Sequence, residues 1–359
     1  MIRWGILLIL AGLGTTGANA APPAARTDDH FHVGVCDGST AVAVGPDEFL
    51  VANDDCSTLE ETVHCNKLFV YKSGASGAAL TSIEITDFME LEKKKKEADL
   101  EGSAALCGKV YWLASHGRNT DGEIKRNRHQ LFAVKVEEHG NDVILTAPGK
   151  PYTKLLEDLL ENPTFKSFTQ ERLAKDTDPD PKLAAEEPGA VNIEGLSAWQ
   201  GDQLLIGFRN PVPEGKALLI PIENAGELVS DIKDRKAQLG EFIQFDLGGR
   251  GIRSIEYWPA RDIYLIMAGP IGEKGAEASQ QFRLYEWSGK RAEAPREIPG
   301  ADLSGLNPEA IVVYPGIWDR FQILSDDGQE KVGGVDCKKL KDDNPDKKFR
   351  SRWIVLPSS

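Results

Sequence analysis

Short segments in which apolar and polar residues alternate recur along the chain from residue 30 to its end. A period of two is typical of β-strands that bury one face, and residues 30–35 (HFHVGV) and 81–85 (TSIEI) are examples. The 35 glycines and 20 prolines supply turn signals between these segments. Leucines follow a helical spacing at residues 154–160 (KLLEDLL). We therefore predict an all-β chain with a short helical insertion near 152–176.

The predicted strands group into units of four. Two central units share the same order of motifs. Glu101-Gly102 and Glu194-Gly195 open the first strand, while Arg118-Asn119 and Arg209-Asn210 follow the second. The predicted units cover residues 36–88, 99–150, 192–247, 251–299 and 307–356. Repeated four-stranded units of this length are typical of a β-propeller. We predict five blades, and a sixth, degenerate blade is the alternative.

The last unit lacks one strand, and residues 30–35 form a strand that belongs to no unit. We predict that this N-terminal strand completes the last blade, because closing the ring in this way covers an exposed strand edge. Residues 30–359 would then form a single propeller domain.

The first 20 residues have the pattern of an export signal. Arg3 precedes an apolar run over residues 4–13, and Ala18-Asn19-Ala20 resembles a cleavage site. Residues 21–29 form a polar linker, and no second long apolar segment follows. The mature chain is therefore expected to be exported, periplasmic or secreted, without a membrane span.

The charge balance excludes some partners. The chain has 42 Lys and Arg against 56 Asp and Glu, a formal net charge of −14. Such an excess of acid disfavours nucleic acids and anionic membrane surfaces as partners.

Five cysteines in an exported chain predict two disulfides and one free thiol. In the predicted ring, Cys56 and Cys65 share one loop, and Cys36 lies beside Cys337 of the neighbouring last blade. We predict the pairs Cys56–Cys65 and Cys36–Cys337, with Cys107 free.

One mouth of the channel would collect the starts of the inner strands and the loops that follow the second strands. The ligand-binding candidates at this mouth are Glu101, His116, Arg118, Asn119, Glu194, Arg209, Asn210, Arg253 and Glu309. The metal-ligand candidates are Asp54, Asp55, Asp326 and Asp327. As an alternative, each inner-strand glutamate holds an arginine of the next blade in a structural ion pair. His116 is the candidate general base, with a polar surface role as the alternative.

These segments resemble a bacterial family catalogued as domain of unknown function 3616. The resemblance rests on residues 99–102 (DLEG), 111–119 (YWLASHGRN), 127–133 (NRHQLFA) and 192–211 (NIEGLSAWQGDQLLIGFRNP), and covers about residues 36–330. It implies the propeller fold and no reaction. The Glu-Gly opening is more distantly similar to the esterase-like, phytase-like secreted propellers, which would imply calcium-assisted hydrolysis of phosphate esters.

Three functions remain open. The first is binding of a small polar or anionic ligand, or a divalent cation, at the Glu/Arg mouth. The second is a metal-assisted esterase or phosphoesterase, in which calcium would be the cofactor and His116 or a carboxylate the base. The third is a scaffold for a cell-envelope partner, so the sequence leaves open whether the protein is an enzyme.

Overall fold

The structure is a computed structural model that describes residues 29–53, 66–92, 97–139, 142–272 and 281–356. The predicted signal peptide, Asp54, Asp55 and the Cys56–Cys65 pair lie outside the described residues. Among the described residues, no helix is long and apolar enough to cross a membrane.

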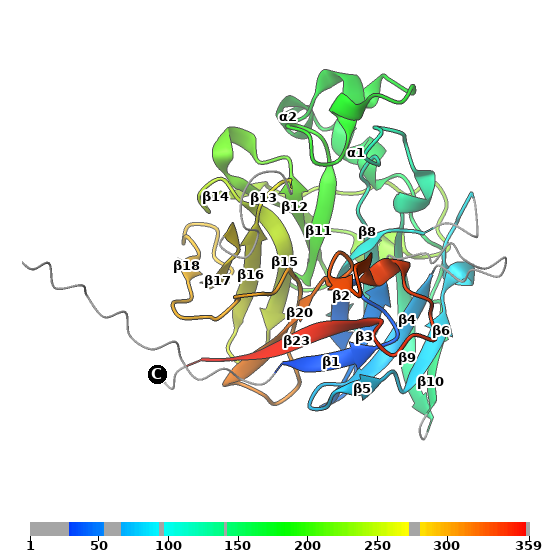
Figure 1. Cartoon of the computed structure of the whole chain (residues 1–359). Helices are drawn as coiled ribbons and strands as arrows, with labels where there is room; N and C mark the ends of the chain where they lie inside the picture. The colour runs from blue at the N-terminus through cyan, green and yellow to red at the C-terminus, as the bar shows by residue number, and fades with distance from the viewer. Residues whose placement is uncertain (1–28, 54–65, 93–96, 140–141, 273–280, 357–359) are drawn as a thin grey trace, which may run out of the picture.

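Five antiparallel sheets form the blades of a β-propeller, as predicted (Figure 1). Blade 1 is β2 (Gly38–Ala43), β3 (Glu48–Asn53), β4 (Lys67–Lys72) and β6 (Thr81–Glu84). Blade 2 is β7 (Leu100–Leu106), β8 (Lys109–Ala114), β9 (Leu131–His139) and β10 (Asp142–Thr146). Blade 3 is β11 (Asn192–Ala198), β12 (Leu204–Asn210), β13 (Ala217–Ile222) and β14 (Ile243–Phe245). Blade 4 is β15 (Gly251–Trp258), β16 (Ile263–Gly269), β17 (Arg283–Trp287) and β18 (Arg296–Glu297).

Blade 5 closes the ring with the N-terminal strand. Its order is β19 (Pro308–Val312), β20 (Arg320–Ser325), β23 (Lys348–Val355), β1 (His30–Val33) and β5 (Gly77–Ala78). Strand β1 pairs antiparallel with β23, and β5, from the chain of blade 1, adds a parallel pair on its outer side. A hairpin of β21 (Lys331–Val332) and β22 (Val335–Asp336) follows β20. The predicted closure is confirmed.

A disulfide fastens the same seam. Cys36 and Cys337 are joined although 301 residues separate them in sequence, which confirms this predicted pair. Cys107 is free and exposed in the turn between β7 and β8. In the same blade, His32 is buried, its Nε2 is hydrogen-bonded to Ser351 Oγ at 2.7 Å, and its ring stacks on Phe349.

The core lies between neighbouring blades, and each adjacent pair shares a cluster of buried apolar side chains. The glycine of the repeated Glu-Gly opening permits this packing. A Cβ on Gly102 would lie 2.7 Å from Leu196 Cβ, and one on Gly195 would lie 2.9 Å from Ile252 Cγ2. Both glycines are therefore positions where the next blade approaches the backbone directly.

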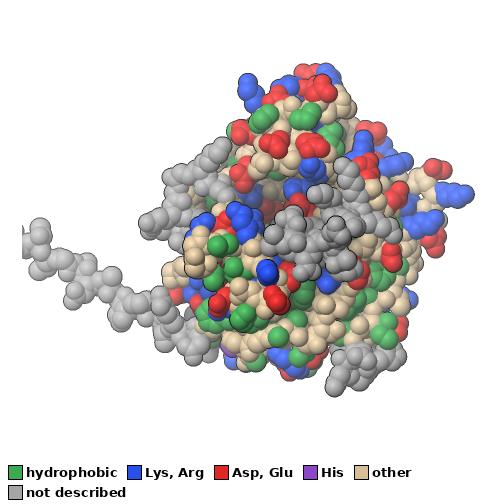
Figure 2. Space-filling model, turned by 45° about the vertical axis from the view of Figure 1, so that its right-hand side comes forward, with side chains coloured by type: hydrophobic (Ala, Val, Ile, Leu, Met, Phe, Trp, Pro, Cys, Tyr) green, Lys and Arg blue, Asp and Glu red, His purple; other side chains and the backbone are tan. Residues whose placement is uncertain are grey.

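The predicted helical insertion is present between blades 2 and 3. It contains α1 (Leu155–Glu161) and α2 (Pro163–Phe168), followed by 3₁₀ turns at Glu171–Ala174 and Pro181–Leu183. Asn162 caps α2 by accepting hydrogen bonds from the Thr164 and Phe165 amides, which begins the helix there. Figure 1 shows the insertion standing on one end of the ring, above β8 and β11. Acidic and basic side chains are interspersed over its surface at the top of Figure 2.

Candidate functional site

The charged residues at the mouth occupy β-bulges of the innermost strands. The ladder register shifts at Glu101 in β7, Glu194 in β11, Arg253 in β15 and Glu309 in β19. A bulge leaves one residue without a cross-strand partner and re-aims its side chain. The charged residue near the start of each of these four strands therefore has no residue directly opposite it on the neighbouring strand.

Three blades are joined by ion pairs between these side chains. Glu194 contacts Arg209 of its own blade at 3.0 Å and Arg253 of blade 4 at 3.1 Å, and Arg253 pairs with Glu309 of blade 5. All four side chains are buried, with at most 10% of each exposed. We call this set the mouth network. Its carboxylates and guanidinium groups neutralise one another, which is the arrangement expected of structural pairing.

The two Arg-Asn motifs hold the insertion against the ring. Asn210 Nδ2 donates to the carbonyl oxygens of Ala185 and Glu187, at 2.8 and 2.7 Å. Arg209 Nη2 contacts the Glu186 carboxylate at 3.2 Å. The insertion is therefore fastened by the last two residues of strand β12.

In blade 2 the arginine of the equivalent motif, Arg118, also holds the insertion against the ring. Arg118 Nη1 donates to the Gly122 carbonyl oxygen at 3.1 Å, and Nη2 donates to the carbonyl oxygens of Leu173 and Asp176 in the insertion. Asn119 instead stabilises its own loop, because its Oδ1 accepts from the Glu123 amide at 2.8 Å.

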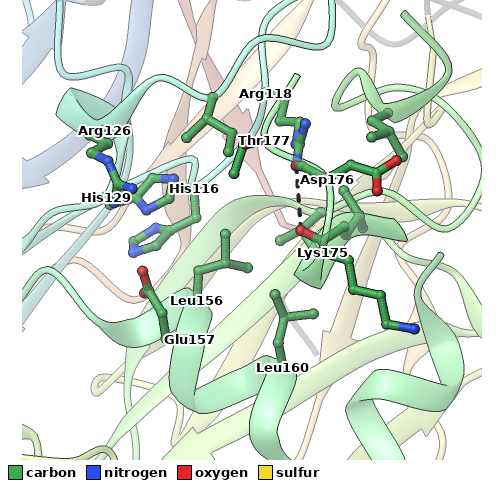
Figure 3. Close-up of a pocket in the computed structure, with 14 residues that line it drawn as sticks. His116, Arg118, Arg126, His129, Leu156, Glu157, Leu160, Lys175, Asp176 and Thr177 are labelled. Carbon is green, nitrogen blue, oxygen red and sulfur yellow. Dashed lines mark hydrogen bonds between the residues drawn. The ribbon is translucent and has the colours of Figure 1, made fainter. Parts of the chain in front are cut away.

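A pocket of about 200 Å³ lies between the loop after β8 and the insertion. The loop after β8 supplies His116, Arg118, Ile124, Arg126 and His129, and the segment between blades 2 and 3 supplies Leu156, Glu157, Leu160, Leu173, Lys175, Asp176, Thr177, Leu183 and Val191. Figure 3 shows the two imidazole rings near Glu157 on one side, Arg118 and Asp176 on the other, and the leucines of α1 between them. We call it the His116 pocket.

His116 is held in one tautomer. Its Nδ1 lies 2.7 Å from the Ala114 carbonyl oxygen, which can only accept, so Nδ1 carries the proton. Its ring stacks on His129 with centroids 5.5 Å apart, and Nε2 has no hydrogen-bond partner among the described residues. Burial, with a smaller contribution from His129, lowers the pKa of His116 to about 3. The ring is neutral at pH 7, and a pKa so far below the working pH makes Nε2 a weak proton acceptor, so a hydrogen-bonding role suits His116 better than that of general base.

His129 is also neutral. Burial, then the charges of Arg126 and Arg118, lower its pKa to about 4. The two histidines therefore add no positive charge to the pocket at neutral pH.

Burial lowers the pKa of Arg118, and the Asp176 and Asp180 carboxylates counter this only from beyond ion-pair distance. Within the described part of the chain, no acidic side chain lies at ion-pair distance from its guanidinium, and the Asp176 carboxylate pairs with Arg172 instead. Three of the five guanidinium donors contact carbonyl oxygens, and the other two have no protein partner there. This cation, only 7% exposed, borders the pocket.

The candidate metal ligands that the structure describes are engaged elsewhere. Asp327 forms a two-pronged ion pair with Arg350 and accepts from Ser325 Oγ at 2.8 Å. Asp326 Oδ1 accepts from the Gly328 amide at 2.8 Å. Among the described residues, no group of three His, Cys, Asp or Glu side chains could hold a metal ion.

Sequence reasoning named His116 and Arg118 but missed the other side of the pocket. His129 stands in the NRHQLFA segment, and the leucines of residues 154–160 were assigned only to helix packing. Their role in the pocket has no local signal, because it depends on where the insertion folds back.

Solved structures with a similar arrangement include an exo-beta-1,3-galactanase from Phanerochaete chrysosporium, with 7% identity, a TM-score of 0.44, and 90% of this chain and 60% of that chain covered. A GH43 beta-1,3-galactosidase, BT3683, has 10% identity, a TM-score of 0.45 and coverages of 89% and 90%. The Cps50 (Swd1) beta-propeller domain of Myceliophteria thermophila has 10% identity, a TM-score of 0.36 and coverages of 92% and 99%. These likenesses add nothing about activity.

The family comparison is more specific. No curated protein matches the chain, and nothing in the comparisons supports the more distant phytase-like link. One family model matches residues 38–310, from blade 1 into the first strand of blade 5. The chain therefore belongs to the β-propeller family described as Protein of unknown function (DUF3616).

Proposed function

We propose that this protein binds a small organic anion in the His116 pocket. The sequence placed a polar or anionic ligand at the Glu/Arg mouth. The charges of the mouth network already neutralise one another, so the proposal moves the ligand to the neighbouring pocket. His116 and Arg118, two of the predicted ligand-binding residues, line this pocket.

The carrying observation is the buried Arg118 guanidinium without a carboxylate partner. A buried charge is unfavourable unless it is paired, and carbonyl oxygens compensate only part of the lost hydration. An anion in the pocket would complete the pairing and use the two remaining donors. The orphaned Nε2 of His116 is an acceptor, so an ordered water would satisfy it, because the carboxylate of an anion has no hydrogen to donate.

The test is thermal unfolding of the purified mature protein with a panel of small anions: phosphate, acetate, succinate, benzoate and hexanoate. A ligand present at 100 times its Kd should raise the Tm by about 5 °C. Leu160→Trp, which fills the pocket and leaves Arg118 in place, should abolish the shift.

Arg118→Met should also abolish it, and Arg296→Met, which removes an arginine that is 81% exposed on blade 4, is the matched control. If no anion raises the Tm, or if Leu160→Trp leaves the shift intact, the pocket is not the binding site.

We infer further that the protein works outside the cytoplasm. The Cys36–Cys337 disulfide is compatible with an oxidising compartment, where such bonds persist. Comparing the N-terminal residue of protein recovered from the periplasm or medium with the predicted cleavage after Ala20 tests this directly.

A further inference from the structure

We infer that the ligand of the His116 pocket is a short aliphatic monocarboxylate with about five or six carbons. The inference rests on the proposed function and narrows it to one chemical class. Three features of the pocket support it: an apolar wall, one unbalanced cation, and a small volume.

The wall opposite the histidines is apolar. Leu156, Leu160 and Leu173 pack one side against the core shared by blades 2 and 3, yet each is only partly buried and lines the pocket with the rest of its surface. Ile124 continues this wall from the loop of blade 2. A sugar or polyol would place hydroxyl groups against these side chains without hydrogen-bond partners, whereas an alkyl chain would bury apolar surface on both sides.

The charges favour a single anionic group. Of the three cations that line the pocket, Lys175 pairs with Glu171 and Arg126 pairs with Glu92 at 3.4 Å, which leaves Arg118. Glu157 also lines the pocket and has no ion-pair partner among the described residues. A second anionic group on the ligand would meet this carboxylate and no further unpaired cation. The neutral imidazole rings do not change this balance.

The volume sets the length. At about 30 Å³ for each water-sized group, a cavity of about 200 Å³ holds about seven such groups. Pentanoate and hexanoate, with seven and eight non-hydrogen atoms, would fill this space, whereas the end of a decanoate chain would extend beyond it and gain no further contact. The carboxylate would lie at Arg118 and the chain against the leucines.

Isothermal titration of the mature protein with acetate, butanoate, hexanoate and decanoate tests the inference. Affinity should rise about fourfold for each added methylene up to hexanoate, and then stop rising or fall at decanoate. Two matched compounds isolate the charge requirement. Hexan-1-ol lacks the anion and adipate adds a second one, and both should bind at least tenfold more weakly than hexanoate.

Variants tie the preference to the pocket. Leu160→Ala enlarges the cavity and should move the best ligand to a longer chain, while Leu80→Ala, at an exposed leucine of blade 1, should leave the series unchanged. If phosphate or adipate binds more tightly than hexanoate, or if affinity is independent of chain length, this inference is overturned and the anion site stands. If no anion binds at all, both proposals fall together.

Discussion

The mouth network and the His116 pocket both contact the insertion at one end of the ring. They differ in whether their buried arginines are paired with carboxylates. In the network, Glu194, Arg253 and Glu309 find their counter-charges in one another across three blades. In the pocket, Arg118 meets carbonyl oxygens and an open cavity. The same Arg-Asn motif therefore lies in an ion-pair network in blade 3 and beside a pocket in blade 2. Charged residues at a channel mouth do not by themselves mark a site.

The largest expected effect is a loss of stability when the mouth network is broken while the His116 pocket is left intact. Arg253→Met leaves Glu194 and Glu309 buried without their shared cation, which should lower the free energy of unfolding by about 3–5 kcal/mol. Urea denaturation measures the change. Ligand binding in the pocket should remain in the folded fraction, because Arg253 does not line it.

A companion variant sharpens this test. Adding Glu194→Gln and Glu309→Gln to Arg253→Met removes the stranded charges and should recover part of the lost stability. If Arg253→Met instead leaves stability intact and abolishes binding, the network is the ligand site and the comparison is reversed.

Acid should destabilise both the seam and the pocket through buried neutral histidines. Burial, helped by His30, lowers the pKa of His32 to about 3, and the pKa values of His116 and His129 are about 3 and 4. The unfolded chain binds these protons near pH 6.5. Each contribution to stability is therefore complete above pH 6.5 and is lost as the pH falls, at about 1.4 kcal/mol per pH unit for each histidine.

Between pH 6.5 and 5.0 each of these histidines should thus remove about 1.6 kcal/mol from the free energy of unfolding. His32→Phe, inside the ring cluster of Phe49, Tyr71 and Phe349, should reduce the slope by one proton. Urea denaturation at several pH values gives the slope, and an unchanged slope in His32→Phe would show that His32 is not neutral in the native state.

A smaller effect is expected where the insertion is fastened. Asn210→Ala removes the two hydrogen bonds to Ala185 and Glu187 and should lower stability by about 1–2 kcal/mol. It should also speed proteolysis within residues 176–189 and weaken anion binding, because the insertion forms one wall of the pocket. Asn119→Ala, which loses a bond within its own loop, is the matched control. Equal proteolysis rates in the two variants would contradict the fastening role.

Much of the ring could be predicted because its signals are local and repeated. The missing strand of the last blade and the strand at residues 30–35 implied each other, and the Cys36–Cys337 pair followed from that closure. The bulges could not be predicted, because residues such as Glu101 and Arg253 lie within the first three positions of their strands, where too few residues precede the shift for a break in the alternation to show. The pairing of the mouth network remained one of two alternatives, since only the distances between blades decide it.

The pocket was harder to foresee than the ring. His116 and Arg118 stood in a conspicuous motif, but the partners of Arg118 in the insertion are the carbonyl oxygens of Leu173 and Asp176, a group that every residue carries. The leucines of α1 carried a signal for packing, and the same signal would be present whether they faced a closed core or an open cavity.

The smallest expected effect is the most discriminating for the pocket itself. If Arg118 provides the positive charge and His116 and His129 stay neutral, the affinity for hexanoate should change by less than about twofold between pH 5.5 and 8, where the carboxylate is ionised throughout. A site built on a protonated imidazole would instead lose affinity about tenfold per pH unit above its pKa. Titrations at four pH values in this range separate the two cases. Binding that is independent of pH, lost in Arg118→Met and kept in Arg296→Met would assign the charge to Arg118, because removing Arg118 can only raise the pKa of His129 and so takes no positive charge from the imidazole rings.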